Sequence, residues 1–118
     1  MAFARIAPKY WAGHPGNVMV CSTRHIENLY ALPDADSDAV FRLTRDVAVA
    51  MRSTYGCDGV SIRQHNEPAG DQDLWHLHVH VLPRYAGDDL YRRHHETGWL
   101  SELHRACWAD RLRPALTG

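Results

Sequence analysis

The sequence has few cysteines, no long apolar run and no excess of either charge. Its 118 residues include three cysteines, Cys21, Cys57 and Cys107, which are widely spaced and form no Cys-x-x-Cys pair. This number and spacing favour reduced thiols over a disulfide framework. No apolar run approaches the roughly 20 residues that cross a bilayer, and "MAFARIAPKYW" lacks a signal-peptide core and cleavage site. We therefore expect a cytoplasmic protein with no membrane partner.

The charges are nearly balanced, because 13 basic residues stand against 14 acidic ones for a net charge of −1. Proteins that wrap nucleic acid are usually clearly basic, so nucleic acid is not an expected partner. The chain shows no repeat, low-complexity tract or linker. With 45% hydrophobic residues, it is expected to form a single domain over residues 1–118. Nine histidines are the unusual feature, and they indicate ligand chemistry or proton transfer.

The apolar pattern predicts one strand and one long helix in the first half of the chain. The run "VMVCS" (18–22) follows the turn signal "GHPGN" and predicts a strand. Segment 32–56 predicts the helix, which we expect to end at Gly56. Residues at helical spacing define its buried face: Val40, Phe41, Thr44, Val47, Met51 and Tyr55. The turn and N-cap before it are expected from Pro33, Asp34, Asp36 and Ser37.

Two later segments predict a pair of antiparallel strands. "GVSIRQHN" (59–66) alternates, with Val60 and Ile62 on one face, and "LWHLHVHVLP" (74–83) closes at a proline. The short loop "EPAGDQ" joins them. Segment 98–116 predicts a short helix or two. We therefore expect an α+β fold, a mostly antiparallel sheet with one long helix packed across it.

Three histidines alternate along the second of these strands. Because strand side chains point to opposite faces in turn, His76, His78 and His80 share one face with Leu74 and Leu82. The other face would be the core face, and it carries Trp75, Leu77, Val79 and Val81. Cα atoms two residues apart on a strand lie roughly 6.6 Å apart, so three imidazoles are expected to form a row on a rigid support.

Such a row can bind a cation, or it can present an unprotonated ring nitrogen as a nucleophile or base. Two strand histidines at i and i+2 can share Zn²⁺, with a third ligand from Asp73 or a neighbour. A single strand histidine is usually a solvated surface residue. Three in register, flanked by "NEPAGDQ" and "PRY", favour a functional site.

These residues resemble the histidine triad (HIT) family of nucleotide hydrolases and nucleotidyltransferases. "HLHVHVL" is similar to the family's His-φ-His-φ-His-φ-φ pattern, in which φ is apolar. "PGNVMV…RHIENLYALPD", "NEPAGDQDLWH" and "LPRY" resemble, in the same order, its first strand and turn, the loop before the triad, and its exit. The resemblance covers roughly residues 3–92 and implies a HIT-like fold. Family members usually have a strand and helix before the segment matching "AFARI", so the fold is expected to be N-terminally shortened.

The resemblance implies a mechanism and a set of site residues. His78 would attack the α-phosphorus of a nucleotide, and water would then release the covalent nucleotidyl-imidazole intermediate. His80 would contact the phosphate or leaving group, and His76 would orient the site. Asn66 and Gln72 match the family's amide contacts to the phosphate. No metal or other cofactor is required in this reaction, and zinc binding is not the favoured interpretation.

Several positions depart from the family pattern. Ile6, with Phe3, resembles the wall around base and ribose, but Arg5 stands where an acidic residue or Asn contacts the ribose. Asn17 stands where His is common, and Asp73 replaces Ser or Thr, so leaving-group specificity is expected to differ. These departures leave a third alternative, a nucleotide-binding module that has lost turnover.

The remaining features are assigned structural roles. His25 matches a family position that can join a zinc site, but without a cysteine pair it is interpreted as a structural loop residue. The other histidines are interpreted as surface or packing residues: His14, His65, His94, His95 and His104. Asp88 and Asp89 predict a solvated loop. The resemblance implies a homodimer through the long helix and a sheet edge, with Trp99 and Trp108 as candidate interface or core residues.

Overall fold

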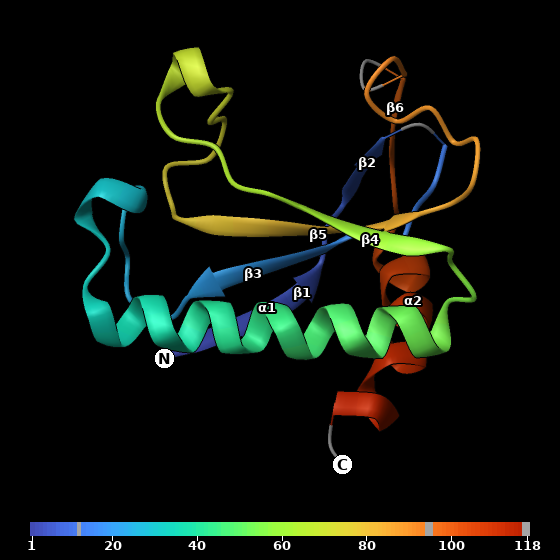
Figure 1. Cartoon of the computed structure of the whole chain (residues 1–118), viewed down its shortest axis with the longest axis horizontal. Helices are drawn as coiled ribbons and strands as arrows, with labels where there is room; N and C mark the ends of the chain where they lie inside the picture. Colours follow the sequence, from blue (N-terminus) through green and yellow to red (C-terminus); the bar gives the residue numbers. More distant parts are fainter. Residues whose placement is uncertain (12, 94–95, 117–118) are drawn as a thin grey trace.

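A computed structural model, which describes residues 1–11, 13–93 and 96–116, shows an antiparallel sheet with a long helix across one face (Figure 1). The elements in chain order are β1 (Ala2–Ile6), β2 (Lys9–Trp11), β3 (Val18–Ser22), η1 (Leu29–Ala31), α1 (Asp34–Thr54), β4 (Gly59–Arg63), η2 (Pro68–Gly70), β5 (His78–Arg84), β6 (Thr97–Trp99) and α2 (Glu102–Leu116). The four-stranded sheet has the order β1-β3-β5-β4, and β2 pairs with β6 in a separate ribbon. The expected α+β fold is confirmed.

The core lies between the sheet and α1. Val79 and Val81 of β5 are at most 1% exposed, and Val47 and Met51 of α1 are fully buried against the sheet. Strand alternation and helical spacing therefore bring these apolar side chains together as expected. Phe41 does not belong to this core, because it is 44% exposed on α1.

The start of α1 differs from the expectation. Pro33 occupies the N-cap position, and no side chain caps the helix there. Asp36 instead accepts hydrogen bonds from the Arg24 guanidinium and, at 3.5 Å, from the N-terminal amine. These contacts lower the pKa of the Asp36 carboxyl, with the Arg24 bond as the main cause. At the other end the chain leaves the helix through Gly56, which has a φ of 69°, as predicted.

Helix α2 is held against the end of α1 by an aromatic contact. The rings of Tyr55 and Trp108 lie 4.9 Å apart, and the Tyr55 hydroxyl donates a 2.7 Å hydrogen bond to the carbonyl oxygen of Gly16. A Cβ at Gly16 would lie 2.9 Å from both rings, so only glycine fits there. Trp108 is therefore a packing residue within the chain. Leu103 of the same helix is 72% exposed.

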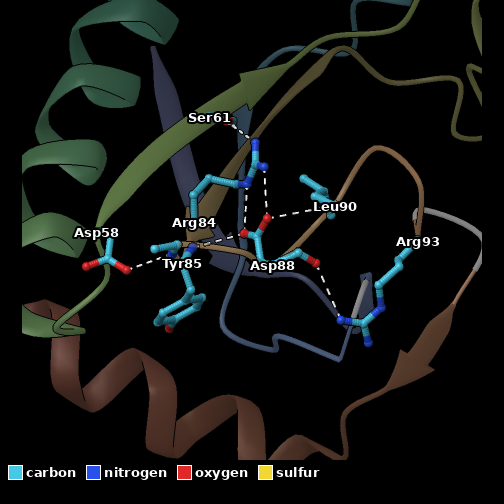
Figure 2. A network of polar contacts seen from close by, with 8 residues as sticks. Asp58, Ser61, Arg84, Tyr85, Asp88, Leu90 and Arg93 are labelled. Atoms are coloured by element: carbon cyan, nitrogen blue, oxygen red, sulfur yellow. Dashed lines mark hydrogen bonds and ion pairs between the residues drawn. The ribbon is translucent and has the colours of Figure 1, made fainter.

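The loop after β5 is closed by a buried carboxylate (Figure 2). Asp88 is 6% exposed and receives two 2.9 Å hydrogen bonds from the Arg84 guanidinium. The backbone N–H groups of Tyr85 and Leu90 also donate to it. The pKa of the Asp88 carboxyl is lowered, first by the Arg84 bond. The prediction of a solvated loop is wrong for Asp88 and holds for Asp89, whose side chain is 51% exposed.

The β2–β6 ribbon covers part of the sheet face opposite α1 (Figure 1). Trp11 of β2 packs edge-on against His80 of β5, with ring centroids 5.1 Å apart. Among the described residues, no helix is long and apolar enough to cross a membrane.

Candidate active site

His78 and His80 lie together on the sheet face that turns away from α1. Register pairs His78 with Cys21 and His80 with Met19, while Val79 between them faces the core. The two imidazole rings are perpendicular, with centroids 4.7 Å apart. The sequence therefore predicted this pair correctly, because strand alternation holds from position 77 onward.

His76 does not extend the row of rings. The chain bends at residues 74–76, and β5 begins only at His78. The His76 Nε2–H donates a 2.7 Å hydrogen bond to the carbonyl oxygen of Ser22, and the ring lies 5.4 Å from that of His25. The same bend leaves Trp75 48% exposed. The expected row of three rings and the buried Trp75 are therefore both wrong.

The backbone of His76, rather than its ring, touches the pair. Its carbonyl oxygen lies 2.8 Å from Nδ1 of His78. Because a carbonyl can only accept, Nδ1 of His78 carries the proton, and in the neutral ring the lone pair is on Nε2. The structure therefore selects the tautomer that a nucleophilic imidazole needs.

A cleft of about 210 Å³ opens over the pair, and it is called here the His78 cleft. His78 and His80 line it together with Asp73 and Lys9. Its remaining lining is largely apolar and includes Met19, Leu74 and Trp99. Both histidines are less than 8% exposed, so they lie at the bottom of the cleft, where a phosphorus atom could approach them.

A second cleft of about 430 Å³ adjoins the first and is called here the Arg63 cleft. It shares His80, Trp11, Lys9 and Asp73 with the His78 cleft. Its further polar residues are Arg63, His65, Asp71 and Gln72. His80 therefore stands between the two clefts, whereas His78 lines only the first.

His80 is held in the neutral form. Burial is the main cause that lowers its pKa, to about 3, and electrostatic interactions with His78, His65, Arg63 and Lys9 lower it further. Its Nδ1 is buried and has no hydrogen-bond partner among the described residues. At neutral pH the ring therefore carries no charge and can donate from one nitrogen and accept at the other.

The two predicted amides are engaged by the chain itself. Asn66 Oδ1 accepts hydrogen bonds from the backbone N–H of Leu29 at 2.9 Å and from Gln64 at 2.8 Å. Gln72 lines the Arg63 cleft, but its amide bonds three backbone groups: those of Glu67, Glu27 and Leu74. Both residues therefore fix the loop between β4 and β5 in this structure.

Three other predicted residues lie away from the histidine pair. Ile6 is 6% exposed in the core, and with Arg5 it lines a separate cleft between β1 and α2. Asn17 is 1% exposed, and neither polar atom of its amide has a hydrogen-bond partner among the described residues. The structure thus brings Asp73 and Gln72 to the clefts, and it does not bring Arg5 or Ile6 there.

Several residues of the clefts were missed in the sequence, among them Lys9, Trp11, Arg63, His65 and Asp71. His65 was assigned to the surface, yet its ring lies 6.0 Å from that of His80. Alternation along segment 59–66 could have placed Arg63 opposite His80, which the register shows. No pattern predicted Lys9 or Trp11, because β2 has only three residues.

His14 and His104 line neither of the two clefts. His14 packs on Tyr85, with ring centroids 4.7 Å apart, and His104 is exposed. His94 and His95 lie outside the described residues. In the ranges 1–11, 13–93 and 96–116, no group of three or more His, Cys, Asp or Glu side chains is placed to hold a metal ion.

The fold and the site together define a class of small α+β proteins in which one sheet face presents a pair of strand histidines to a cleft. The HIT domain family model matches residues 1–87, and the chain belongs to this family. A solved structure of a Hit-like protein involved in cell-cycle regulation from Bartonella henselae is similar over 98% of this chain and 80% of its own, with 26% identity and a TM-score of 0.83.

Two curated relatives each match nearly two thirds of the chain. The protein hit of Bacillus subtilis is 30% identical over 74 residues, which are 63% of this chain and 51% of that protein. The AP-4-A phosphorylase of Mycobacterium tuberculosis is 30% identical over 76 residues, which are 64% of this chain and 39% of that protein. The match thus spans about half or less of these two relatives.

Proposed function

We propose that the chain is a nucleotidyl hydrolase or transferase in which His78 is the nucleophile. Its Nε2 lone pair attacks the α-phosphorus of a nucleoside phosphoester, phosphoramidate or dinucleoside polyphosphate. The new P–N bond forms as the bond to the leaving group breaks, and the leaving group keeps that electron pair. Water then attacks phosphorus, the P–N bond breaks, and the nucleoside monophosphate leaves.

The observation that carries this proposal is the 2.8 Å hydrogen bond from His78 Nδ1 to the His76 carbonyl oxygen. In the neutral ring this tautomer leaves the lone pair on Nε2, which is what an attacking imidazole requires. His80 lines the same cleft in a neutral form, and we assign it contact with the phosphate oxygens or the leaving group. His76 is assigned a positioning role through its backbone carbonyl. We propose that no metal takes part, since imidazole and backbone N–H donors can meet the developing charge.

A test compares wild type with His78→Ala on an adenosine phosphoramidate, with AMP as the measured product. We expect the variant to lose at least about 10³-fold in rate, as enzymes do when a nucleophile is removed. His104→Ala, which changes an exposed histidine on α2, is the matched control and should keep the wild-type rate. Prior treatment with EDTA should leave the wild-type rate unchanged.

Two outcomes would contradict the proposal. Nucleotide binding without turnover by the wild type would indicate a binding module that has lost its activity. Stoichiometric zinc in the purified protein, lost in His78→Ala, would indicate a metal site. Quenching the reaction with base should trap a nucleotidyl-protein adduct in the wild type and none in His78→Ala.

We also propose a homodimer formed through α1 and the edge strand β4. β4 ends the four-stranded sheet, and Ile62 on it is 50% exposed. Val49 of α1 is 65% exposed and lines a shallow, largely apolar cleft with Val60. Burial of these side chains would supply an apolar interface centre. Trp108 is engaged within the chain, and Trp99 lines the His78 cleft, so neither is assigned to this interface.

A further inference from the structure

The Arg63 cleft is built around an arginine that has no acidic partner among the described residues. Arg63 ends β4 directly opposite His80, and its guanidinium carbon lies 5.5 Å from the ring centroid of Trp11. Its Nη1 is buried and makes no hydrogen bond to a described residue. Arg63 is partly buried, and a buried N–H group is normally paired with an acceptor. The donors of Arg63 Nη1 are therefore available to an anion, since no described residue accepts them.

A second cation stands beside it. The ammonium nitrogen of Lys9 lies 6.0 Å from the same Trp11 ring, and Lys9 lines both clefts. The buried Nδ1 of His80 is a further unpartnered polar atom at this junction. Three nitrogen-bearing side chains from three different strands thus converge where the two clefts meet.

Two cations and two carboxylates line the Arg63 cleft: Lys9, Arg63, Asp71 and Asp73. Lys9 and Arg63 both lower the pKa of His80. A phosphate bound beside His80 would therefore meet these two cations.

The position of His80 between the two clefts indicates which part of the substrate each cleft would hold during the proposed reaction. In an in-line displacement the leaving group departs on the side opposite the nucleophile. His78 lines only its own cleft, while His80 lines both. A phosphorus atom bound where the two clefts meet would therefore release its leaving group toward the Arg63 cleft.

We propose that Arg63 and Lys9 bind a phosphate leaving group, so that the preferred substrates are phosphoric anhydrides such as dinucleoside polyphosphates. This inference rests on the proposed function. When the P–O bond breaks, its electron pair stays on the bridging oxygen of the departing phosphate, and the Arg63 guanidinium can bind that oxygen and its neighbour in a bidentate way. An amine leaving group gains nothing from these cations.

The protonation state of His80 agrees with this assignment. An amine must take up a proton as it leaves, and an imidazolium would be the natural donor. With its pKa lowered to about 3, His80 is seldom an imidazolium at neutral pH. A departing phosphate needs no such proton, because it is stable as an anion.

The test measures kcat/KM for diadenosine triphosphate and for adenosine phosphoramidate in wild type and in Arg63→Gln. Wild type should prefer the anhydride, and Arg63→Gln should lower the ratio of the two values at least tenfold. Arg45→Gln removes an exposed arginine of α1 and should keep the wild-type ratio. A ratio that Arg63→Gln leaves intact, or a wild type that prefers the phosphoramidate, would overturn the inference.

Binding of inorganic pyrophosphate, followed by titration calorimetry, gives a readout that needs no turnover. Arg63→Gln should bind it at least tenfold more weakly than wild type and Arg45→Gln do, and equal affinities would overturn the anion subsite. The proposed anion subsite and the proposed His78 reaction can be refuted independently of each other. Turnover that depends on His78 with an unchanged substrate ratio would refute only the subsite, whereas pyrophosphate binding that depends on Arg63 without turnover of either substrate would refute only the reaction.

Discussion

His80 differs from an ordinary histidine because it is buried where two clefts meet, and because the cations Arg63 and Lys9 act on it. Its side chain is 7% exposed, and no carboxylate is among the charges that act on it. In the unfolded chain the same imidazole is solvated and titrates near its usual pKa of about 6.5. The difference between the two states links the stability of the fold to pH.

We predict that acid destabilises the fold through His80. Between pH 6.5 and pH 3 the unfolded chain binds a proton at this ring and the folded chain does not, so the free energy of unfolding falls as pH falls. This contribution is complete above pH 6.5. From pH 7 to pH 5 the loss would be at most about 2 kcal/mol, measured by urea unfolding at both pH values.

The variant His80→Gln isolates this effect because glutamine does not titrate. Wild type should lose more stability than His80→Gln between pH 7 and pH 5, and His104→Gln should follow wild type since His104 is exposed. Equal losses in wild type and His80→Gln would show that His80 can take up its proton in the folded chain.

At the residue scale, the sequence predicted side-chain directions only where the backbone is a strand. Alternation placed His78 and His80 correctly because both belong to β5. It failed at Trp75 and His76, where the chain bends before the strand. The contact that holds His76 there is a hydrogen bond to Ser22, 54 residues away, and no local pattern reports such a contact.

At the scale of elements, the loop after β5 depends on the contact between Arg84 and Asp88. The carboxylate receives two guanidinium and two backbone hydrogen bonds (Figure 2), while the same guanidinium donates to Ser61 of β4 at 2.9 Å. One buried ion pair thus joins β4, β5 and the loop that leads toward β6.

Asp88→Asn should lower the free energy of unfolding by about 2–4 kcal/mol, because it leaves Arg84 unpaired and replaces one acceptor oxygen with a donor. Asp89→Asn is the matched control. Asp89 is exposed, its ion pair with Arg92 is 3.7 Å long, and asparagine tolerates its φ of 55°. Urea unfolding should place Asp89→Asn within about 0.5 kcal/mol of wild type. An equally mild effect of Asp88→Asn would show that the ion pair contributes little net stability.

Elements with a clear apolar pattern were predicted well, and elements without one were missed. Strand β3 has the bounds expected for 18–22, and α1 spans most of the predicted 32–56, because 21 residues give a clear periodic pattern. The ribbon of β2 and β6 was missed, since two strands of three residues have almost no pattern of their own. That ribbon brings Trp11 and Lys9 to the histidines, so much of the Arg63 cleft was missed with it.

At the scale of the whole molecule, the sheet has two different edges. Strand β1 ends one side and is contacted by α2, whereas β4 ends the other with Ile62 half exposed. An uncovered strand edge with apolar side chains is a surface that proteins usually protect or pair. The proposed dimer would pair it with a second copy of the chain.

Ile62→Asp should therefore convert a homodimer into a monomer, because the interface would bury an unpaired carboxylate. Light scattering coupled to size exclusion would show a wild-type mass of about twice 13.4 kDa and a variant mass of about 13.4 kDa. Leu103→Asp is the control, since Leu103 is 72% exposed on α2, and it should stay dimeric. A second variant, Val49→Asp, changes α1 instead of the strand and should also be monomeric. A monomeric wild type would refute the proposed dimer. A dimer that persists in both Ile62→Asp and Val49→Asp would show that the interface lies elsewhere.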